Sequence, residues 1–322
     1  MKNGATLTEL DLQVLATMEQ DPTISNQALA DSLGITRAQV LARLTRIESL
    51  DIAHVVALTD VFAGDARMVN LYVKASGRPV ADLASTLTAL PFTMSVVGLL
   101  GPDDLLVAMR LPAGRDTADA LDLLMDIEGV GSVRSALVLQ AYLGRSERMH
   151  FSQMRTGSVE DRKARLMVDL VNADADDLDL SLIAEFQTNG RARIRDLSHR
   201  YGLTQGAIRY RLKNLHSKKL LRLALAVDPL ALGLQFWTSF EISVAPKLLP
   251  AVVEQVCEHP HAVLVTRTTG TASLQCVVLT PGIQEARGIL DWLRQLEGVT
   301  GVTPQVLSDV YKNEAIWGIF PH

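Results

Sequence analysis

Positively charged side chains are concentrated in one segment of the chain, between Arg191 and Arg222. This segment holds ten lysine and arginine residues and one acidic residue, Asp196, so its net charge is +9. Cations of this kind neutralise phosphate groups, and affinity for nucleic acid rises with the number of cations presented. The segment is therefore a candidate phosphate-binding surface, although the whole chain has a net charge of −5 and a pI near 5.8. The basic residues are Arg191, Arg193, Arg195, Arg200, Arg209, Arg211, Lys213, Lys218, Lys219 and Arg222.

A tight turn lies inside this basic segment, at the sequence YGLT of residues 201–204. Glycine permits a sharp turn, and Thr204 is placed to cap the helix that follows, on which Ile208, Leu212 and Leu215 have helical spacing. Helix, glycine turn and helix form the helix-turn-helix arrangement, whose second helix enters the major groove of DNA. The candidate DNA contacts here are Arg191, Arg193, Arg200, Thr204, Gln205, Arg209, Tyr210, Arg211, Lys213, Lys218 and Lys219.

The same pattern occurs earlier in the chain. Asp11 of a Leu-Asp-Leu triplet returns as Asp179, and Gly34 returns as Gly202, in both cases 168 residues later. The triplet EGV at 128–130 returns at 297–299, so the two copies keep register over a whole half, which indicates a duplication. Residues 24–53 contain three arginines and three acidic residues, so this first module is neutral and is the weaker candidate. Its candidate DNA contacts are Arg37, Gln39, Arg43 and Arg46.

Each helical module is followed by short strands that alternate with helices. In the first half we expect strands at 69–74, 94–99, 105–111 and 130–139, with helices at 80–90 and 117–127. The second half repeats this order over 236–307. The order βαββαβ is that of a ferredoxin-like domain. The predicted fold class is α+β, with two repeats, each a winged-helix or helix-turn-helix domain followed by a ferredoxin-like domain. The expected bounds are 1–58, 66–141, 176–228 and 234–312, with a linker at 142–175 that includes a helix near 159–171.

The sequence gives no sign of export, membrane insertion or a catalytic set. The amino terminus lacks an apolar run, and the longest uncharged stretch, 83–102, is interrupted by proline and polar residues, so a cytoplasmic location is predicted. Cys257 and Cys276 have no metal-ligand spacing and are expected to be buried thiols. The pair His259 and His261 lacks a third ligand. We therefore predict no catalytic residue, no metal and no cofactor.

With the glycine turns, the Arg-Leu pairs at 43–44 and 211–212 and the two βαββαβ regions, each half resembles a complete member of the Lrp/AsnC family of feast/famine transcriptional regulators. The resemblance covers about 7–140 and 176–310. It implies a DNA-binding helix-turn-helix domain and a ferredoxin-like domain that dimerises and binds a small effector, often an amino acid. The usual member has one copy, so this chain resembles a fused tandem form. The implied partners are double-stranded DNA, a small-molecule effector, and a second copy in a homodimer or higher even oligomer.

In such regulators effectors bind near the loop between the second and third strands of the ferredoxin-like domain. Here these loops are GPDD at 101–104 and GTAS at 270–273, and only the first has acidic residues. Glycine allows close approach to the backbone, and a carboxylate could pair with an amino group. A plain tight turn is the alternative for both loops. The candidate effector contacts are Gly98, Gly101, Asp103, Asp104, Arg267, Thr269, Gly270, Thr271 and Ser273.

Two other functions remain open for this architecture. The tandem arrangement also resembles decarboxylases of sirohaem, which hold a tetrapyrrole with histidine, tyrosine and arginine residues around the second strand. Here the strand at 262–267 offers only Arg267, with His259 and His261 just upstream. The third possibility is a scaffold or sensor that acts through its ferredoxin-like surfaces, which the neutral first module favours and the basic second module opposes.

Overall fold

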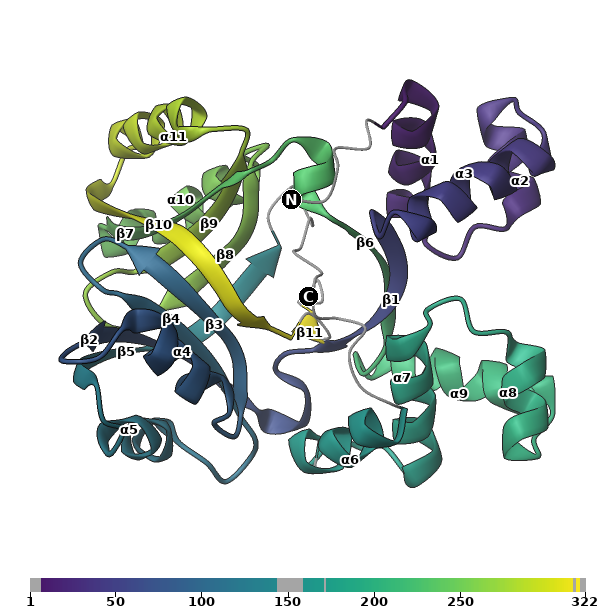
Figure 1. Cartoon of the computed structure of the whole chain (residues 1–322), viewed down its shortest axis with the longest axis horizontal. Coiled ribbons are helices and arrows are strands. Elements are labelled where there is room, and N and C mark those ends of the chain that lie inside the picture. Colours follow the sequence, from purple (N-terminus) through teal and green to yellow (C-terminus); the bar gives the residue numbers. More distant parts are fainter. Residues whose placement is uncertain (1–6, 144–158, 171, 315–316, 319–322) are drawn as a thin grey trace.

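The computed structural model describes residues 7–143, 159–170, 172–314 and 317–318, which form two similar halves (Figure 1). The elements of the first half are α1 (Glu9–Gln20), α2 (Asn26–Leu33), α3 (Arg37–Ser49), β1 (Ala53–Asp60), β2 (Arg67–Ala75), α4 (Val80–Thr88), β3 (Thr93–Leu100), β4 (Leu105–Leu111), α5 (Thr117–Met125) and β5 (Val130–Leu143). Helix α6 (Val159–Asp169) precedes the second half, in the predicted linker, which lies partly outside the described residues.

The second half repeats the first. Each helix and strand of its helical module and its ferredoxin-like region begins about 168 residues after the corresponding element of the first half. Its elements are α7 (Asp177–Thr188), α8 (Ile194–Tyr201), α9 (Gln205–Ser217), β6 (Arg222–Val227), β7 (Phe236–Val244), α10 (Leu249–Cys257), β8 (Ala262–Thr268), β9 (Leu274–Thr280), α11 (Ile283–Gln295) and β10 (Val299–Asn313), followed by the short β11 (Trp317–Gly318). Among the described residues no helix is both long enough and apolar enough to cross a lipid bilayer.

Both predicted glycine turns are present. Helix α2 ends at Gly34 and helix α8 at Gly202, each with φ of 64°, a left-handed conformation that glycine adopts without steric cost. The next helix is capped in both copies, because Thr36 accepts a hydrogen bond from the Gln39 amide and Thr204 accepts one from the Ala207 amide. These turns position α3 and α9 as the second helices of two helix-turn-helix modules.

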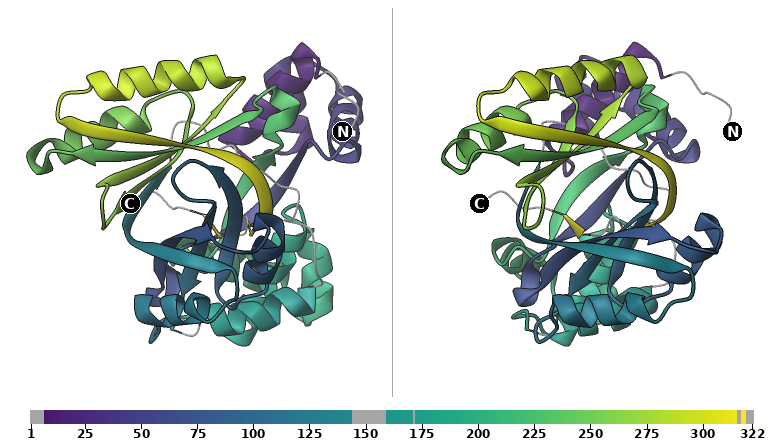
Figure 2. Two further views of the ribbon diagram at one scale, coloured as in Figure 1. Left: turned by 60° about the vertical axis from the view of Figure 1, so that its left-hand side comes forward. Right: turned by 90° about the vertical axis from the view of Figure 1, so that its left-hand side faces the viewer.

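The two ferredoxin-like regions share one closed sheet, in the order β10-β3-β4-β2-β5-β8-β9-β7. Strand β5 pairs with β8, and β10 pairs with β3, so each half completes the edge of the other. Helices α4 and α5 cover the outer face of the first half, and α10 and α11 cover that of the second (Figure 2). The predicted βαββαβ order is confirmed in both halves, and the two ferredoxin-like regions of one chain pack together through the shared sheet.

Two strands that the sequence analysis missed, β1 and β6, join the helical modules. They run antiparallel, from Ala53 opposite Val227 to Leu58 opposite Arg222 (Figure 1). Strand β1 is buried along almost its whole length, so it lacks the alternation of polar and apolar residues that identifies a half-buried strand. The pairing places the two modules next to each other on the side of the molecule away from α10 and α11.

The contact between Gly190 and β1 predicts a large effect of a small substitution. The Gly190 amide donates to the Val55 carbonyl at 3.1 Å, and a Cβ at position 190 would overlap the backbone of Val55 and Val56. We expect Gly190→Ala to lower the free energy of unfolding by about 2 kcal/mol, because backbone cannot move aside as a side chain can. As a control, Gly288→Ala in α11 meets open space and should raise it by about 0.5–1 kcal/mol. Urea denaturation measures both, and equal midpoints for the two variants would contradict this packing.

Candidate nucleic-acid interface

One face of α9 is exposed and carries polar and basic side chains. Gln205, Arg209, Tyr210 and Lys213 are all exposed, and Tyr210 retains 72% of its accessible surface. On the opposite side of the helix Ile208 is buried in the module core, as predicted. Within the described part of the chain no carboxylate lies within ion-pairing distance of Arg209 or Lys213. These two cations are therefore available for phosphate oxygens or base edges in a groove.

Other basic residues of this segment are already neutralised by carboxylates that lie outside it. Arg211 donates to Asp176 and Asp179, both at 2.7 Å. Arg200 pairs with Glu185, and Lys218 lies 2.8 Å from an oxygen of Asp174. The free positive charge is therefore smaller than the +9 of the segment alone. It is concentrated at Arg209 and Lys213 on α9 and at the exposed Arg193 and Arg195 near the start of α8.

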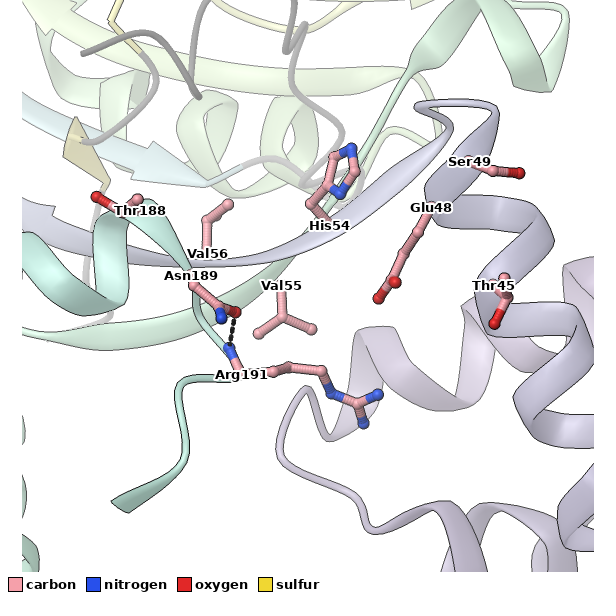
Figure 3. A pocket seen from close by; sticks show the side chains of 9 residues that line it. All are labelled: Thr45, Glu48, Ser49, His54, Val55, Val56, Thr188, Asn189 and Arg191. Atoms are coloured by element: carbon pink, nitrogen blue, oxygen red, sulfur yellow. Dashed lines mark hydrogen bonds between the residues drawn. The ribbon is translucent and has the colours of Figure 1, made fainter. Parts of the chain in front are cut away.

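Arg191, a candidate DNA contact, instead reaches the first module. Its guanidinium donates to the Ile24 carbonyl at 3.0 Å and lies 3.5 Å from Asn26 Oδ1. It lines a cleft of about 630 Å³ between the modules, together with Glu48 and His54 (Figure 3). Lys219, another candidate, has φ of 59°, and its carbonyl accepts from the Asp60 amide of β1. Arg191 and the Lys219 backbone thus join the modules to each other.

The first module presents a different surface. Arg37 and Gln39 are exposed at the start of α3, and Gln39 Oε1 accepts from the Thr36 amide as part of a capping box. Arg43 and Arg46 face α1, where they lie 3.5 and 2.5 Å from the carboxylate of Asp11. The repeated Leu-Asp-Leu and Arg-Leu motifs therefore hold the first helix of each module on the third.

The buried carboxylate of Asp11 predicts a pH dependence of stability. Burial raises its pKa, but hydrogen bonds from Thr8 and the guanidinium groups of Arg46 and Arg43 outweigh burial, so the net pKa lies below its ordinary value. A lowered pKa in the folded state stabilises the fold above the unfolded value of about 4, and this contribution is lost as the pH falls through the folded pKa. Asp11→Asn should therefore unfold at lower urea at pH 7 and lose less stability between pH 7 and pH 3.5 than the wild type. Circular dichroism measures both midpoints, and parallel losses in the two proteins would contradict the assignment.

The first candidate effector loop is already engaged by the protein. Asp103 accepts from Arg134 at 2.7 Å, and Asp104 accepts from the Ala75 amide at 2.8 Å. Arg134 also donates to both carboxylate oxygens of Glu241 in the second half, and its guanidinium lies 3.9 Å from the ring centre of Tyr72. The sequence analysis did not single out Arg134 or Glu241. Asp103 thus belongs to a partly buried network that joins the two halves, and Asp104 binds the backbone of its own half.

The second candidate loop also lies at the junction of the halves. Thr269 Oγ1 accepts from the Leu137 amide of β5, and Gly270 lies close to the Ser135 carbonyl. Thr271 and Ser273 bond to β7, at Ser243 and Val244, and Arg267 is exposed on β8. Gly98 and Gly101 of the first half pack against β10 in the same way. All the candidate effector residues therefore lie near the interface between the ferredoxin-like regions.

The two histidines weighed for tetrapyrrole or metal binding contact other parts of the second half. His259 packs on Trp292, with ring centres 4.7 Å apart, and His261 Nδ1 lies 2.9 Å from the Leu279 carbonyl. Burial lowers the pKa of His259. Cys276 is buried, and Cys257 is partly buried. In the described ranges no group of three histidine, cysteine or acidic side chains is arranged to hold a metal ion.

These features define a class: a tandem helix-turn-helix protein in which two modules are attached to paired ferredoxin-like domains. The AsnC-type helix-turn-helix domain matches the chain twice, at residues 7–48 and 176–216. The chain is 28% identical over 138 residues to the HTH-type transcriptional regulator FL11 of Pyrococcus furiosus, and 25% identical to that of Pyrococcus horikoshii. Each match covers 42% of this chain and 91% of the relative, so less than half of this chain spans almost the whole length of each relative. The chain thus carries two AsnC-type helix-turn-helix domains and is similar over this part to single-copy regulators.

A solved structure with the same tandem architecture is the sirohaem decarboxylase NirDL. It superimposes with a TM-score of 0.62 over 96% of this chain and 93% of its own, at 11% sequence identity. At this identity the likeness concerns the fold alone.

Proposed function

We propose that this protein is a sequence-specific DNA-binding transcriptional regulator that acts in the cytoplasm and makes its main DNA contact through α9. The observation that carries the proposal is the exposed face of α9, where Gln205, Arg209, Tyr210 and Lys213 project from a helix fixed by a glycine turn. Arginine pairs with guanine and glutamine with adenine in the major groove, and lysine contacts phosphate. The two matches to the AsnC-type helix-turn-helix domain and the similarity to named transcriptional regulators support the same function.

Mapping of the DNA bound by the tagged full-length chain in its native cells tests this function. We expect discrete sites close to promoters, and loss of these sites when Arg209 is replaced by Leu and Lys213 by Thr. Expression of the genes next to the sites then shows whether binding activates or represses. A bound-DNA profile that is the same for the two chains would overturn the proposal.

We further propose that a small effector, an amino acid or a related metabolite, binds at the interface of the ferredoxin-like domains and changes DNA affinity. Support comes from the loop at 269–273, which lies against β5 of the other half. We expect at least one amino acid of a panel to raise the melting temperature of the wild type. The same amino acid should leave the melting temperature of the Gly270→Val variant unchanged. No response to any of the amino acids or their keto acids would contradict this part of the proposal.

A sirohaem decarboxylase is the second candidate function, because the fold likeness to NirDL extends over almost the whole chain. Titration of the purified protein with sirohaem separates the two candidates. A decarboxylase should produce a saturable change in the absorbance bands of the tetrapyrrole, followed by a change in product mass. A regulator of the proposed kind should leave the spectrum of added sirohaem unchanged while it binds duplex DNA.

A further inference from the structure

We propose that the DNA covered by one chain is asymmetric, with two half-sites of different sequence, so that the chain binds in one orientation. This inference rests on the proposed DNA-binding function and adds the nature of the target. Dimeric helix-turn-helix proteins built from two identical subunits read two equal half-sites, because the symmetry of the protein imposes symmetry on the DNA. Here the two second helices, α3 and α9, belong to one chain, so their sequences can differ. We call these two helices the readers, because they would contact the bases.

The two second helices occupy equivalent places in the fold. Helix α3 spans Arg37–Ser49 and helix α9 spans Gln205–Ser217, so every residue of α3 has a counterpart 168 positions later. Each helix follows a glycine with the same φ and a threonine cap with nearly the same φ and ψ. The antiparallel pair β1 and β6 relates the modules as a two-fold axis relates the subunits of a dimer. Equivalent positions on α3 and α9 are therefore expected to face equivalent positions in the DNA.

The exposed side chains at these equivalent positions differ in chemistry. Arg209 corresponds to Leu41, and Lys213 corresponds to Thr45. Tyr210 corresponds to Ala42, and at the start of the helices Gln205 corresponds to Arg37. All eight side chains are exposed, and Leu41 retains 44% of its accessible surface although it is apolar.

These differences predict two different half-sites. Helix α9 offers hydrogen-bond donors for guanine and phosphate and an amide for adenine. Helix α3 offers Leu41 and Ala42, which suit the methyl group of thymine, and Arg37 at its first turn, whereas its other two arginines bind Asp11. Fewer cations at α3 also mean fewer phosphate contacts there. The half-site under α9 should therefore supply most of the affinity, and the half-site under α3 should be richer in thymine.

The modules are fixed relative to each other, so the distance between the half-sites should be fixed too. Gly190 packs directly on β1, and Arg191 bonds to Ile24 and Asn26 of the first module. Together with the pairing of β1 and β6, these contacts hold the two modules in one relative position. Half-sites of paired helix-turn-helix readers lie about one helical turn apart, or a multiple of it.

Selection of the full-length chain on randomised duplexes tests the proposal. We expect an enriched site with two non-equivalent parts at one spacing, one of them strong. Insertion of about 5 base pairs, half a helical turn, between the parts should reduce affinity at least tenfold, because the second part then faces away. The selected site could instead be an inverted repeat of two equal parts, at the spacing set by α3 and α9 of one chain. That result would contradict the proposed asymmetry, although the chain would still bind DNA. If no sequence is enriched, the proposed function of sequence-specific DNA binding is itself contradicted.

A grafted variant provides the matched control. Arg37→Gln, Leu41→Arg, Ala42→Tyr and Thr45→Lys together give α3 the side chains that α9 exposes at these four positions. All four positions are on the surface, so the fold should be retained, and circular dichroism checks that it is. We expect the selected site to become an inverted repeat of the strong half-site, with at least tenfold higher affinity for that repeat than the wild type has. An unchanged selected site would overturn the proposal, because the exposed residues of α3 would then play no part in recognition.

Discussion

Replacing Arg209 by Leu and Lys213 by Thr is expected to lower the affinity for duplex DNA about 100-fold at moderate salt. The two substitutions give α9 the residues that α3 has at the same positions, so a helix of this surface composition is already tolerated by the fold. Each lost contact to a base edge or phosphate costs about 1–3 kcal/mol, and about 1.4 kcal/mol corresponds to a factor of ten. Fluorescence anisotropy with a labelled duplex measures the change.

The control removes the same two residue types from the far side of the molecule. Arg287→Leu and Lys247→Thr change the net charge by the same amount, and both residues are exposed in the second ferredoxin-like region. This double variant should bind within twofold of the wild type. An equal loss in the two double variants would mean that affinity follows the net charge of the chain rather than the surface of α9.

Replacing Arg110 by Leu should cause a large loss of stability, about 3–5 kcal/mol. Arg110 on β4 is only 1% exposed, and its guanidinium donates to the carbonyl groups of Val61, Ala63 and Asp169. Val61 and Ala63 lie between β1 and β2, and Asp169 is the last residue of α6, whose end carries the negative pole of the helix dipole. One side chain therefore holds the sheet, the first module and the helix before the second module together. Urea denaturation measures the loss, and hydrogen exchange should show faster opening of α6.

Two comparisons make this prediction specific. Leu279 holds the equivalent position in the second half and is fully buried, so leucine itself fits the strand. Arg115→Leu, at an exposed arginine that pairs with Asp119 in the next turn and lies over the Phe92 ring, should cost less than about 1 kcal/mol. Arg110→Lys should recover part of the loss, because an ammonium group reaches one or two carbonyls but lacks the forked geometry. A loss below 1 kcal/mol for Arg110→Leu would show that these hydrogen bonds do not hold the segments together.

Much of the fold follows from local patterns in the sequence. The bounds predicted for β4, residues 105–111, are those observed, because this strand is a short, largely apolar run between turns. The glycine turns were also predictable, because their conformation depends on one residue type. Strands β1 and β6 were missed, because their stability comes from pairing with each other across about half of the chain. That pairing produces no alternation of polar and apolar residues that could be recognised in the sequence of either strand alone.

The residues of the site were harder to predict than the elements that hold them. Counting charge within a segment pointed to α9, whose role in DNA binding stays a prediction, but it could not reveal that Arg211 and Arg46 bind carboxylates more than 30 positions earlier. The network of Arg134, Asp103 and Glu241 joins elements from both halves, so no sequence window contains it. A signal for Arg110 did exist, because it interrupts the otherwise uncharged and largely apolar strand LLVAMRL. A charge in such a strand needs buried partners.

The dependence of DNA affinity on salt tests most directly whether the exposed cations of the second module hold the DNA. Four such cations, at positions 193, 195, 209 and 213, predict that log K falls with log salt with a slope of about −4. The chain with Arg209→Leu and Lys213→Thr should show a slope of about −2. A slope near zero for the wild type, or the same slope for both chains, would contradict the account.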